Sequence, residues 1–524
     1  MRETVTIQCG QAGNAIGNSF WSNLLLEHEN TPDDDAALSA FFRFSENRNN
    51  GNKTMRARAL LIDMECGPLN ETMRSPLGSL FEETQYVMDV SGAGNNFAHG
   101  NAHYGPLYRD KFAESLRRIV EKCDSLQTFI LIHSLGGGTG SGVGTYMLGL
   151  IEDLYPDVYR FATSVYPQDD DDVVTSPYNS VLATRELAEH ADCVFPLDNA
   201  ALQSFVQMET ATANANDQEK GSGSGNDTGK EERDRGFNQM NRVAGRMLCH
   251  MTSSARFHGE MNVDMNELYT NLVPYPGVHF LMTALNPRRP THNSNSNTSS
   301  RSRVKGVKGV SMSTLPKGYI QRAFGDIMSS VGQLSASTPL GLVQSHSSSS
   351  SSSSSPPSTI SSDKGKSMSI AEPPVVLAAA FIGRGRIPLS DFLSSVTNAQ
   401  TQLPFPHWNP DACKIGLCHT PAPGDTVSVM GIYNSTAFKS VLGRQKARFG
   451  KLYHRKAMLH HYTEFVDASV VAEAEARVDQ VLSDYAALEQ GGVPGAGAGA
   501  GVVEWSPQHG AASVMNQFQL ENLF

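Results

Sequence analysis

A glycine-rich run directly follows a predicted strand and constrains this chain more than any other segment. Ser134-Leu-Gly-Gly-Gly-Thr-Gly-Ser-Gly142 comes after the apolar segment 128–133 and begins a helical pattern. At such a junction bare amides and the helix dipole favour an anion such as a phosphate. A flexible loop is the alternative, but the five glycines with Thr139 and Ser141 favour a phosphate site. The run contains no lysine and does not follow the first strand, which excludes the lysine-containing phosphate loop and the dinucleotide-binding fingerprint.

Strand and helix patterns alternate through the first half of the chain. Strands are predicted over 4–8, 57–63 and 128–133, and helices over 16–28 and 109–122. This order is typical of an α/β fold with a parallel sheet, whose ligands lie at the carboxyl ends of the strands. Three further segments of small and polar residues fall there, at 10–14, 63–67 and 91–96. Each alone is an ordinary turn, but together with the glycine run they indicate the walls of one nucleotide pocket.

Composition narrows the class of protein. The 524 residues carry a formal net charge of -11, which argues against general nucleic-acid binding, and no apolar run approaches the roughly 20 residues of a membrane span. The first residues enter a strand without a signal-peptide pattern, so we expect a cytosolic chain with neither nucleic acid nor membrane as partner. Its seven scattered cysteines fit reduced thiols.

These segments resemble the nucleotide loops of tubulins. The resemblance rests on Gly10–Asn14, Ser91–Asn96 and Gly136–Gly142, and it continues through Ser176–Ser180, Gly259–Glu267 and Asn271–Pro276. Within that family the segments 62–65, 89–91, 172–177 and 189–193 are most similar to the epsilon subfamily. The resemblance implies a tubulin-like α/β fold: a parallel-sheet GTP-binding domain, a central helix, a mixed α/β intermediate domain and a C-terminal helical hairpin.

The resemblance also implies the roles of individual side chains around GTP and Mg²⁺. Glu65 matches the carboxylate near the magnesium. Phe237 matches the aromatic residue that stacks on the base, Asn199 and Asn241 match the pair that contacts guanine and ribose, and Asp172 matches a ribose-loop acid. Either asparagine could instead cap a helix, and Ala15 replaces the glutamine usual in the family. The positions that match phosphate contacts are Gln11, Asn95, Ser134, Gly138, Thr139 and Gly140.

Glu267 is the candidate for the group that orients water during hydrolysis. It matches the acid that alpha-type tubulins present to the nucleotide of the next subunit, so catalysis would occur in trans and an isolated monomer would hydrolyse GTP poorly. From the residues alone, Glu267 is a glutamate near a helix N-terminus that only gains from the dipole. Both interpretations stay open at this point.

The resemblance divides the chain into five parts. We expect a nucleotide-binding domain over 1–236, with a disordered insertion at 209–235, and a central helix over 237–256. The intermediate domain spans 257–430, with strands at 278–284 and 375–382 and disordered insertions at 292–313 and 335–366. Helices over 438–465 and 468–489 lie within a C-terminal part, 431–490, and a Gly/Ala-rich tail covers 491–524. The basic residues of the 438–465 segment are either a solvated helix face or a partner site.

The implied function is that of a GTP-binding cytoskeletal protein that supports compound microtubules at centrioles, centrosomes or basal bodies. Partners would be delta-tubulin or alpha/beta-tubulin, together with centriolar proteins. The alternative is a structural GTPase subunit of ordinary microtubules, against which the insertions and the missing acidic tail argue. A free-standing hydrolase lacks a self-contained catalytic group.

Overall fold

The computed structural model describes residues 2–29, 35–46, 53–168, 171–214, 229–287, 318–329 and 374–492, together with Pro494. The predicted insertions at 292–313 and 335–366 lie outside the described residues, as do residues 215–228 of the first insertion and the tail beyond Pro494. Residues 209–214 and 229–235 of that first insertion belong to helices. In the described part, no helix combines the length and the apolar composition that crossing a membrane requires.

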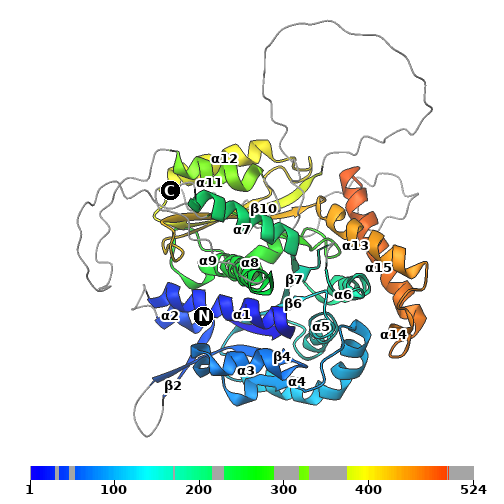
Figure 1. Ribbon diagram of the computed structural model, residues 1–524. Helices are drawn as coiled ribbons and strands as arrows, with labels where there is room; N and C mark the ends of the chain where they lie inside the picture. Colours follow the sequence, from blue (N-terminus) through cyan, green and yellow to red (C-terminus); the bar gives the residue numbers. More distant parts are fainter. Residues whose placement is uncertain are drawn as a thin grey trace, which may run out of the picture.

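The first half of the chain forms a six-stranded parallel sheet, as the alternating pattern predicted (Figure 1). Its order is β5-β4-β1-β6-β7-β8, and every neighbouring pair is parallel. The strands are β1 (Glu3–Cys9), β4 (Ala59–Asp63), β5 (Tyr86–Met88), β6 (Leu126–Ser134), β7 (Tyr159–Tyr166) and β8 (Cys193–Asp198). All residues of β1 are buried, because helices cover both faces of a sheet of this kind.

Alternate residues of the strands enter two separate cores. Ile130 and Ile132 of β6 pack with α1 (Gly10–Glu29) and α8 (Gly229–Met251) on one face. Phe129 and Leu131 pack with α4 (Gly105–Val120), α5 (Gly144–Leu154) and α6 (Ser176–His190) on the other. This division follows from the two-residue period of a strand. Helices α3 (Cys66–Arg74) and α7 (Asn199–Asn214) follow β4 and β8, and α2 (Asp35–Ser39) precedes a hairpin of β2 (Phe42–Glu46) and β3 (Lys53–Ala57).

A second sheet of four strands follows the long helix α8. Its order is β11-β10-β12-β9, with β10 parallel to β11 and antiparallel to β12. The strands are β9 (Leu281–Leu285), β10 (Val376–Gly385), β11 (Cys413–Cys418) and β12 (Val427–Ser435); the helices of this region are α9 (Ser253–Arg256), α10 (Met265–Leu272), α11 (Tyr319–Ser329) and α12 (Leu389–Gln402). The sheet is mixed, as expected for an intermediate domain. The helix predicted over 237–256 is α8 followed by the separate short helix α9.

The C-terminal helices pack against α6 on one side of the molecule (Figure 1). They are α13 (Phe438–Tyr453), α14 (His460–Thr463) and α15 (Ala468–Glu489). The prediction of one continuous helix over 438–465 is wrong, because residues 454–459 form a turn. Lys456 and Met458 in this turn have φ angles of 51° and 59°, which a right-handed helix does not allow.

Candidate nucleotide-binding site

The parallel sheet reverses its strand order between β1 and β6. The chain passes from β1 to β4 and β5 on one side, and then to β6, β7 and β8 on the other. Ligands of such sheets bind in the crevice at the carboxyl ends of the strands at this point. Gly10, which follows β1, and Gly140, which follows β6, lie against each other there: a β-carbon on Gly10 would be 3.0 Å from the Gly140 nitrogen. Gly10 also has a φ of +75°, which favours glycine.

The glycine run forms the start of a helix, as its sequence predicted. A π-helical turn covers Thr139–Val143 and continues into α5. The Ser141 amide donates to the Gly137 oxygen at 3.3 Å, and the amides that precede it lie at a helix N-terminus, where no earlier turn supplies acceptors. Gly138 lies directly against the 91–96 segment: a β-carbon there would be 2.6 Å from the Asn96 nitrogen and 2.7 Å from the Ala93 oxygen. The two segments therefore meet so closely that a side chain at Gly138 does not fit.

The buried side chain of His133 on β6 contacts the backbone of the glycine run. Its Nδ1 lies 2.8 Å from the Gly140 oxygen, and its Nε2 lies 2.7 Å from Oγ of Ser164 on β7. Burial lowers the pKa of His133 to about 4, so the ring is neutral at pH 7. A neutral ring that donates from Nδ1 to the Gly140 carbonyl accepts from Ser164 at Nε2. His133 was not among the predicted site residues; its signal is a histidine directly after the apolar run 129–132.

The residues predicted to contact phosphates lie on the segments that meet at the carboxyl ends of β1 and β6. Gln11 is the exposed second residue of α1, and Ser134 ends β6. Asn95 is exposed and has a φ of 51°, a conformation that asparagine tolerates better than most residues. Gly138, Thr139 and Gly140 occupy the start of the helix that follows β6. The structure brings three segments that are far apart in the sequence to one place.

Two carboxyl groups lie at the end of β4. Asp63 is only 3% exposed; its Oδ1 accepts from the Glu65 amide at 3.2 Å, and its buried Oδ2 has no hydrogen-bond partner. Burial raises the pKa of Asp63 to about 7. Glu65 is exposed at the N-terminus of α3, and a β-carbon on Gly92 would be 2.8 Å from its Oε1. The orphaned oxygen beside an exposed carboxylate fits the oxygen ligands that Mg²⁺ prefers. Asp63 was missed as a site residue, although it ends a strand.

The residues predicted to contact the base and ribose come from three other segments. Asn199 is the first residue of α7, directly after β8. Phe237 and Asn241 lie one turn apart on α8; the Phe237 side chain is 45% exposed. Helix α8 packs on α7, where Arg246 pairs with Glu209. Asp172 is exposed in the segment that precedes α6, with interactions to its surroundings.

Glu267 lies at the opposite end of the sheet. Asp264 caps α10 by accepting from the Glu267 amide at 2.8 Å, and Asp264 Oδ1 also accepts from Gln127 at 3.4 Å. Gln127 is at the amino end of β6, and the seven residues from there to Ser134 span about 23 Å. Glu267 therefore does not reach the crevice of its own chain. Its Oε2 is instead 3.2 Å from Nζ of Lys414 on β11, an ion pair that the sequence analysis did not anticipate.

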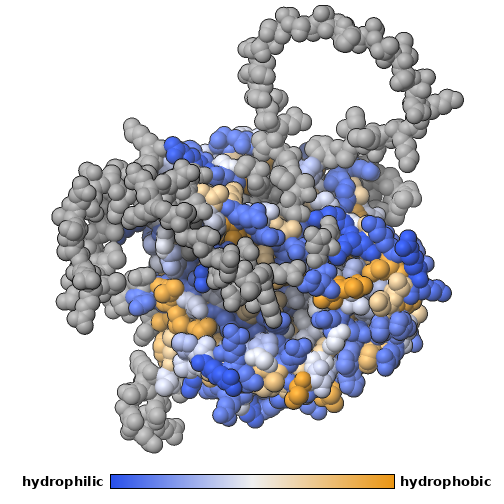
Figure 2. Space-filling view, in the orientation of Figure 1, coloured by the Kyte–Doolittle hydropathy of each residue, from blue (hydrophilic) through white to orange (hydrophobic). Residues whose placement is uncertain are grey.

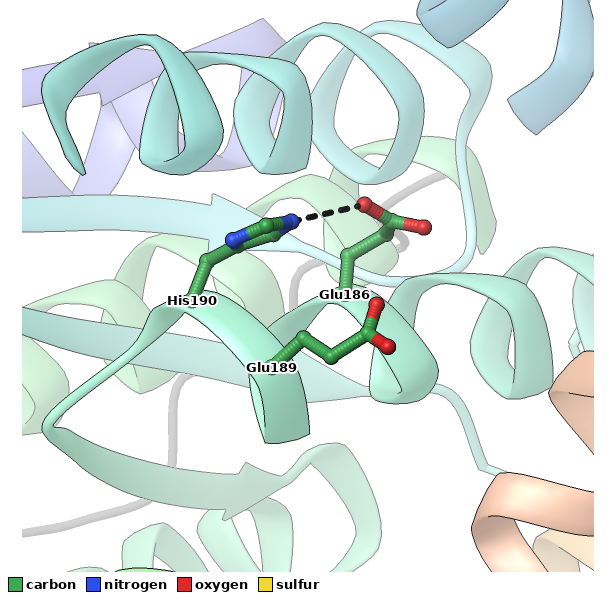
Figure 3. Close-up of side chains that lie close together, drawn as sticks. All are labelled: Glu186, Glu189 and His190. Atoms are coloured by element: carbon green, nitrogen blue, oxygen red, sulfur yellow. Dashed lines mark ion pairs between the residues drawn. The ribbon is translucent and has the colours of Figure 1, made fainter. Parts of the chain in front are cut away.

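A separate cluster of side chains of the kinds that bind metals lies at the C-terminal end of α6 (Figure 3). Among the described residues, the ligand atoms of Glu186, Glu189 and His190 come within 4.8 Å of one another. The pKa of His190 is raised to about 9, mainly by its hydrogen-bonded ion pair with Glu186. Burial lowers this pKa, and the 2.6 Å contact with Glu152 raises it further. A protonated imidazole does not ligate a metal, and Arg185 lies 3.5–3.7 Å from both glutamates of α6. We interpret the cluster as an ion-pair network, about 20 Å along α6 from the crevice.

Comparisons with known proteins agree with this geometry. Residues 3–207 match the model of the Tubulin/FtsZ family, GTPase domain. The chain is 35% identical over 509 residues to the tubulin epsilon chain of Homo sapiens, and equally to that of Mus musculus; the match covers 93% of this chain and 96% of each relative. It is 30% identical over 506 residues to a tubulin beta chain of Pneumocystis carinii, covering 94% of this chain and 97% of that relative. The crevice with its glycine run lies inside the matched domain, and the chain belongs to the tubulin family.

Proposed function

We propose that this chain binds GTP with Mg²⁺ in the crevice between β1 and β6. The observation that carries the proposal is the close approach of Gly10 to Gly140, and of Gly138 to the 91–96 segment, at the point where the strand order reverses. The amides at the start of the helix after β6 would receive the phosphates, and Gln11, Asn95 and Ser134 would add neutral donors.

Asp63 and Glu65 would hold the magnesium ion. No lysine or arginine occurs between Gly136 and Gly142, so the phosphate charge needs a counter-charge from elsewhere. When bound, the ion supplies that positive charge beside the phosphates. The ion would give the buried Oδ2 of Asp63 a partner and so remove the free-energy cost of burying an unpaired oxygen.

The guanine and ribose would lie toward α7 and α8. An exposed phenylalanine on a helix offers a flat apolar face, so Phe237 would stack on the base. Asn199 and Asn241 offer both donors and acceptors to its edge and to the ribose, and Asp172 would accept from a ribose hydroxyl.

Glu267 would act on a nucleotide held by the next subunit. Its separation from its own crevice, about 23 Å along β6, supports action in trans rather than in cis. Lys414 would have to release or share Glu267 on docking, because the two now form an ion pair. The chain would then be the activating half of a longitudinal contact with delta-tubulin or with alpha/beta-tubulin.

The cellular role follows from the similarity to tubulin epsilon chains. We propose that the chain acts in the cytoplasmic cytoskeleton, at centrioles, centrosomes or basal bodies, in the assembly of compound microtubules with centriolar proteins. The higher identity to the epsilon chains, 35% against 30% for the beta chain, supports this role over that of a bulk microtubule subunit.

Phosphate release from GTP tests the trans mechanism. The purified chain is mixed with alpha/beta-tubulin or delta-tubulin, and wild type is compared with Glu267→Gln and with Glu260→Gln, an exposed glutamate nearby. We expect phosphate release above that of the separate proteins with wild type and with the Glu260 variant, and none above it with Glu267→Gln. Equal release by all three variants would contradict the role of Glu267. Sedimentation of the chain with GTP as a polymer on its own would favour the bulk-subunit alternative.

A further inference from the structure

The side-chain amide of Asn179 uses all of its hydrogen-bonding capacity. Its Nδ2 donates to the backbone oxygen of Gly136 at 2.7 Å and to the backbone oxygen of Asn95 at 2.9 Å. Its Oδ1 accepts from the Phe97 amide at 2.9 Å and from the Tyr462 hydroxyl at 2.6 Å. Asn179 is fully buried on α6, so each of these groups would be costly to leave without a partner.

Three of the four partners belong to the two segments that form the phosphate crevice. Gly136 opens the glycine run, and Asn95 and Phe97 belong to the segment that packs against Gly138. Asn95 has a φ of 51°, and its oxygen also accepts from Thr175 Oγ1 at 3.0 Å. One side chain therefore sets the distance between the two segments and holds Asn95 in an uncommon backbone conformation.

The fourth partner, Tyr462, comes from the C-terminal helices. The Tyr462 ring stacks on Tyr178, with ring centroids 4.9 Å apart, and its hydroxyl is buried against Asn179. Tyr178 in turn donates to the Ala457 oxygen at 2.8 Å. Ala457 lies between Lys456 and Met458, the two residues of the 454–459 turn with positive φ.

A second contact joins the same two regions. The Asn96 side chain donates to the His461 oxygen at 2.7 Å, and the ring of His99 stacks on Phe465 with centroids 4.6 Å apart. The start of α14 thus contacts the 91–97 segment directly through His461, whereas the 454–459 turn contacts α6 through Ala457. Non-glycine residues in a left-handed conformation persist only where their surroundings hold them, and these contacts do so.

We infer that Asn179 is a positioning residue for the phosphate crevice, and that Tyr462 couples the crevice to the 454–459 turn. The inference rests on the proposed function, because it takes GTP as the ligand. A ligand that orders the 91–97 and 136–142 segments then also orders the turn. By linkage, a partner whose affinity for the turn is changed by bound GTP changes GTP affinity by the same factor. The C-terminal surface is thereby a place from which a partner can regulate the nucleotide.

Tyr462→Phe tests the coupling, because it removes one hydroxyl and keeps the stacked ring. Tyr485→Phe is the matched control: this tyrosine is also buried in the C-terminal helices, but its hydroxyl meets the backbone of Phe280. We expect GTP affinity to fall about threefold to tenfold in the Tyr462 variant, the worth of one hydrogen bond, and to stay unchanged in the control. In wild type GTP should slow hydrogen exchange in residues 454–465, and in Tyr462→Phe that effect should be lost.

Hydrogen exchange without nucleotide separates this inference from the proposed function. In the nucleotide-free Tyr462→Phe chain, we expect faster exchange at the Phe97 amide and across 136–142 than in wild type or Tyr485→Phe. Unchanged exchange there, or wild-type GTP affinity in Tyr462→Phe, would overturn the coupling. If wild type binds no GTP while the exchange change is present, the proposed function fails and the positioning role of Asn179 stands.

Discussion

A buried ion triad joins three parts of the chain, and its central glutamate is the strongest target for a stability test. Glu27 of α1 contacts Arg256 of α9 at 2.6 Å and Arg384 of β10 at 2.7 Å. The side chains are 1%, 0% and 0% exposed. Burial alone would raise the pKa of Glu27, but the two arginines outweigh it and lower that pKa. Glu27 is therefore ionised at pH 7.

Glu27→Gln removes the negative charge and leaves two buried guanidinium groups. Arg256 keeps a bond to the Cys249 oxygen at 2.8 Å, and Arg384 keeps one to the Thr420 oxygen at 3.2 Å, so neither loses all its acceptors. Breaking a buried pair in this way costs about 3–5 kcal/mol of the free energy of unfolding. For a folded unit of about 400 residues, with an unfolding entropy near 0.8 kcal/mol/K, Tm should fall by about 4–6 °C.

Differential scanning calorimetry of the purified chain measures this shift. Glu114→Gln is the matched control, because Glu114 also contacts two arginines, Arg117 and Arg118, but on the surface, where it is 43% exposed. Solvent screens that triad, so Tm should not change measurably. Equal Tm shifts in the two variants would refute the reasoning that burial makes the Glu27 triad contribute more to stability than an exposed one.

Three further predictions concern the crevice and α6. Gly138→Ala should abolish GTP binding in equilibrium titration, because its β-carbon would lie 2.6 Å from a backbone nitrogen. Gly325→Ala on α11, where a β-carbon would have nothing within 4 Å, should bind GTP as wild type does. Phe237→Ala should weaken GTP binding by about fivefold to a hundredfold in the same titration, since stacking on a base is worth about 1–3 kcal/mol; unchanged affinity would exclude stacking. The pKa of His190 is raised from 6.5 to about 9, so its contribution to stability is complete below pH 6.5 and is lost as pH rises to 9. Urea denaturation should therefore show that the free energy of unfolding falls less between pH 6.5 and 9 in His190→Gln than in wild type. An equal fall in the two chains would contradict the ion-pair interpretation.

The parallel sheet and the crevice could be predicted because their signals are local. Strand, glycine run and helix follow one another along the chain, and the geometry of a parallel sheet then brings the carboxyl ends together. Asn96 and Gly138 meet at the crevice for this reason, although more than forty residues separate them.

The remaining features depend on contacts between distant segments. Lys456 and Met458 belong to residue types that favour helices, so no local pattern reveals the turn at 454–459; the Tyr178 hydroxyl bonded to Ala457 overrides that propensity. The pairing of Glu267 with Lys414 likewise joins α10 to β11 without any pattern in either segment. The roles of Glu267 and of the base-contacting residues remain predictions.

The nucleotide that co-purifies with the chain tests whether the glycine run holds GTP. The chain is purified without added nucleotide, denatured, and its released nucleotide is separated by ion-exchange chromatography and quantified against protein, with Gly138→Ala treated identically. We expect about one guanine nucleotide per wild-type chain and none in the variant. Adenine nucleotide in place of guanine, or the same guanine content in both chains, would contradict a GTP site at the junction of β1 and β6.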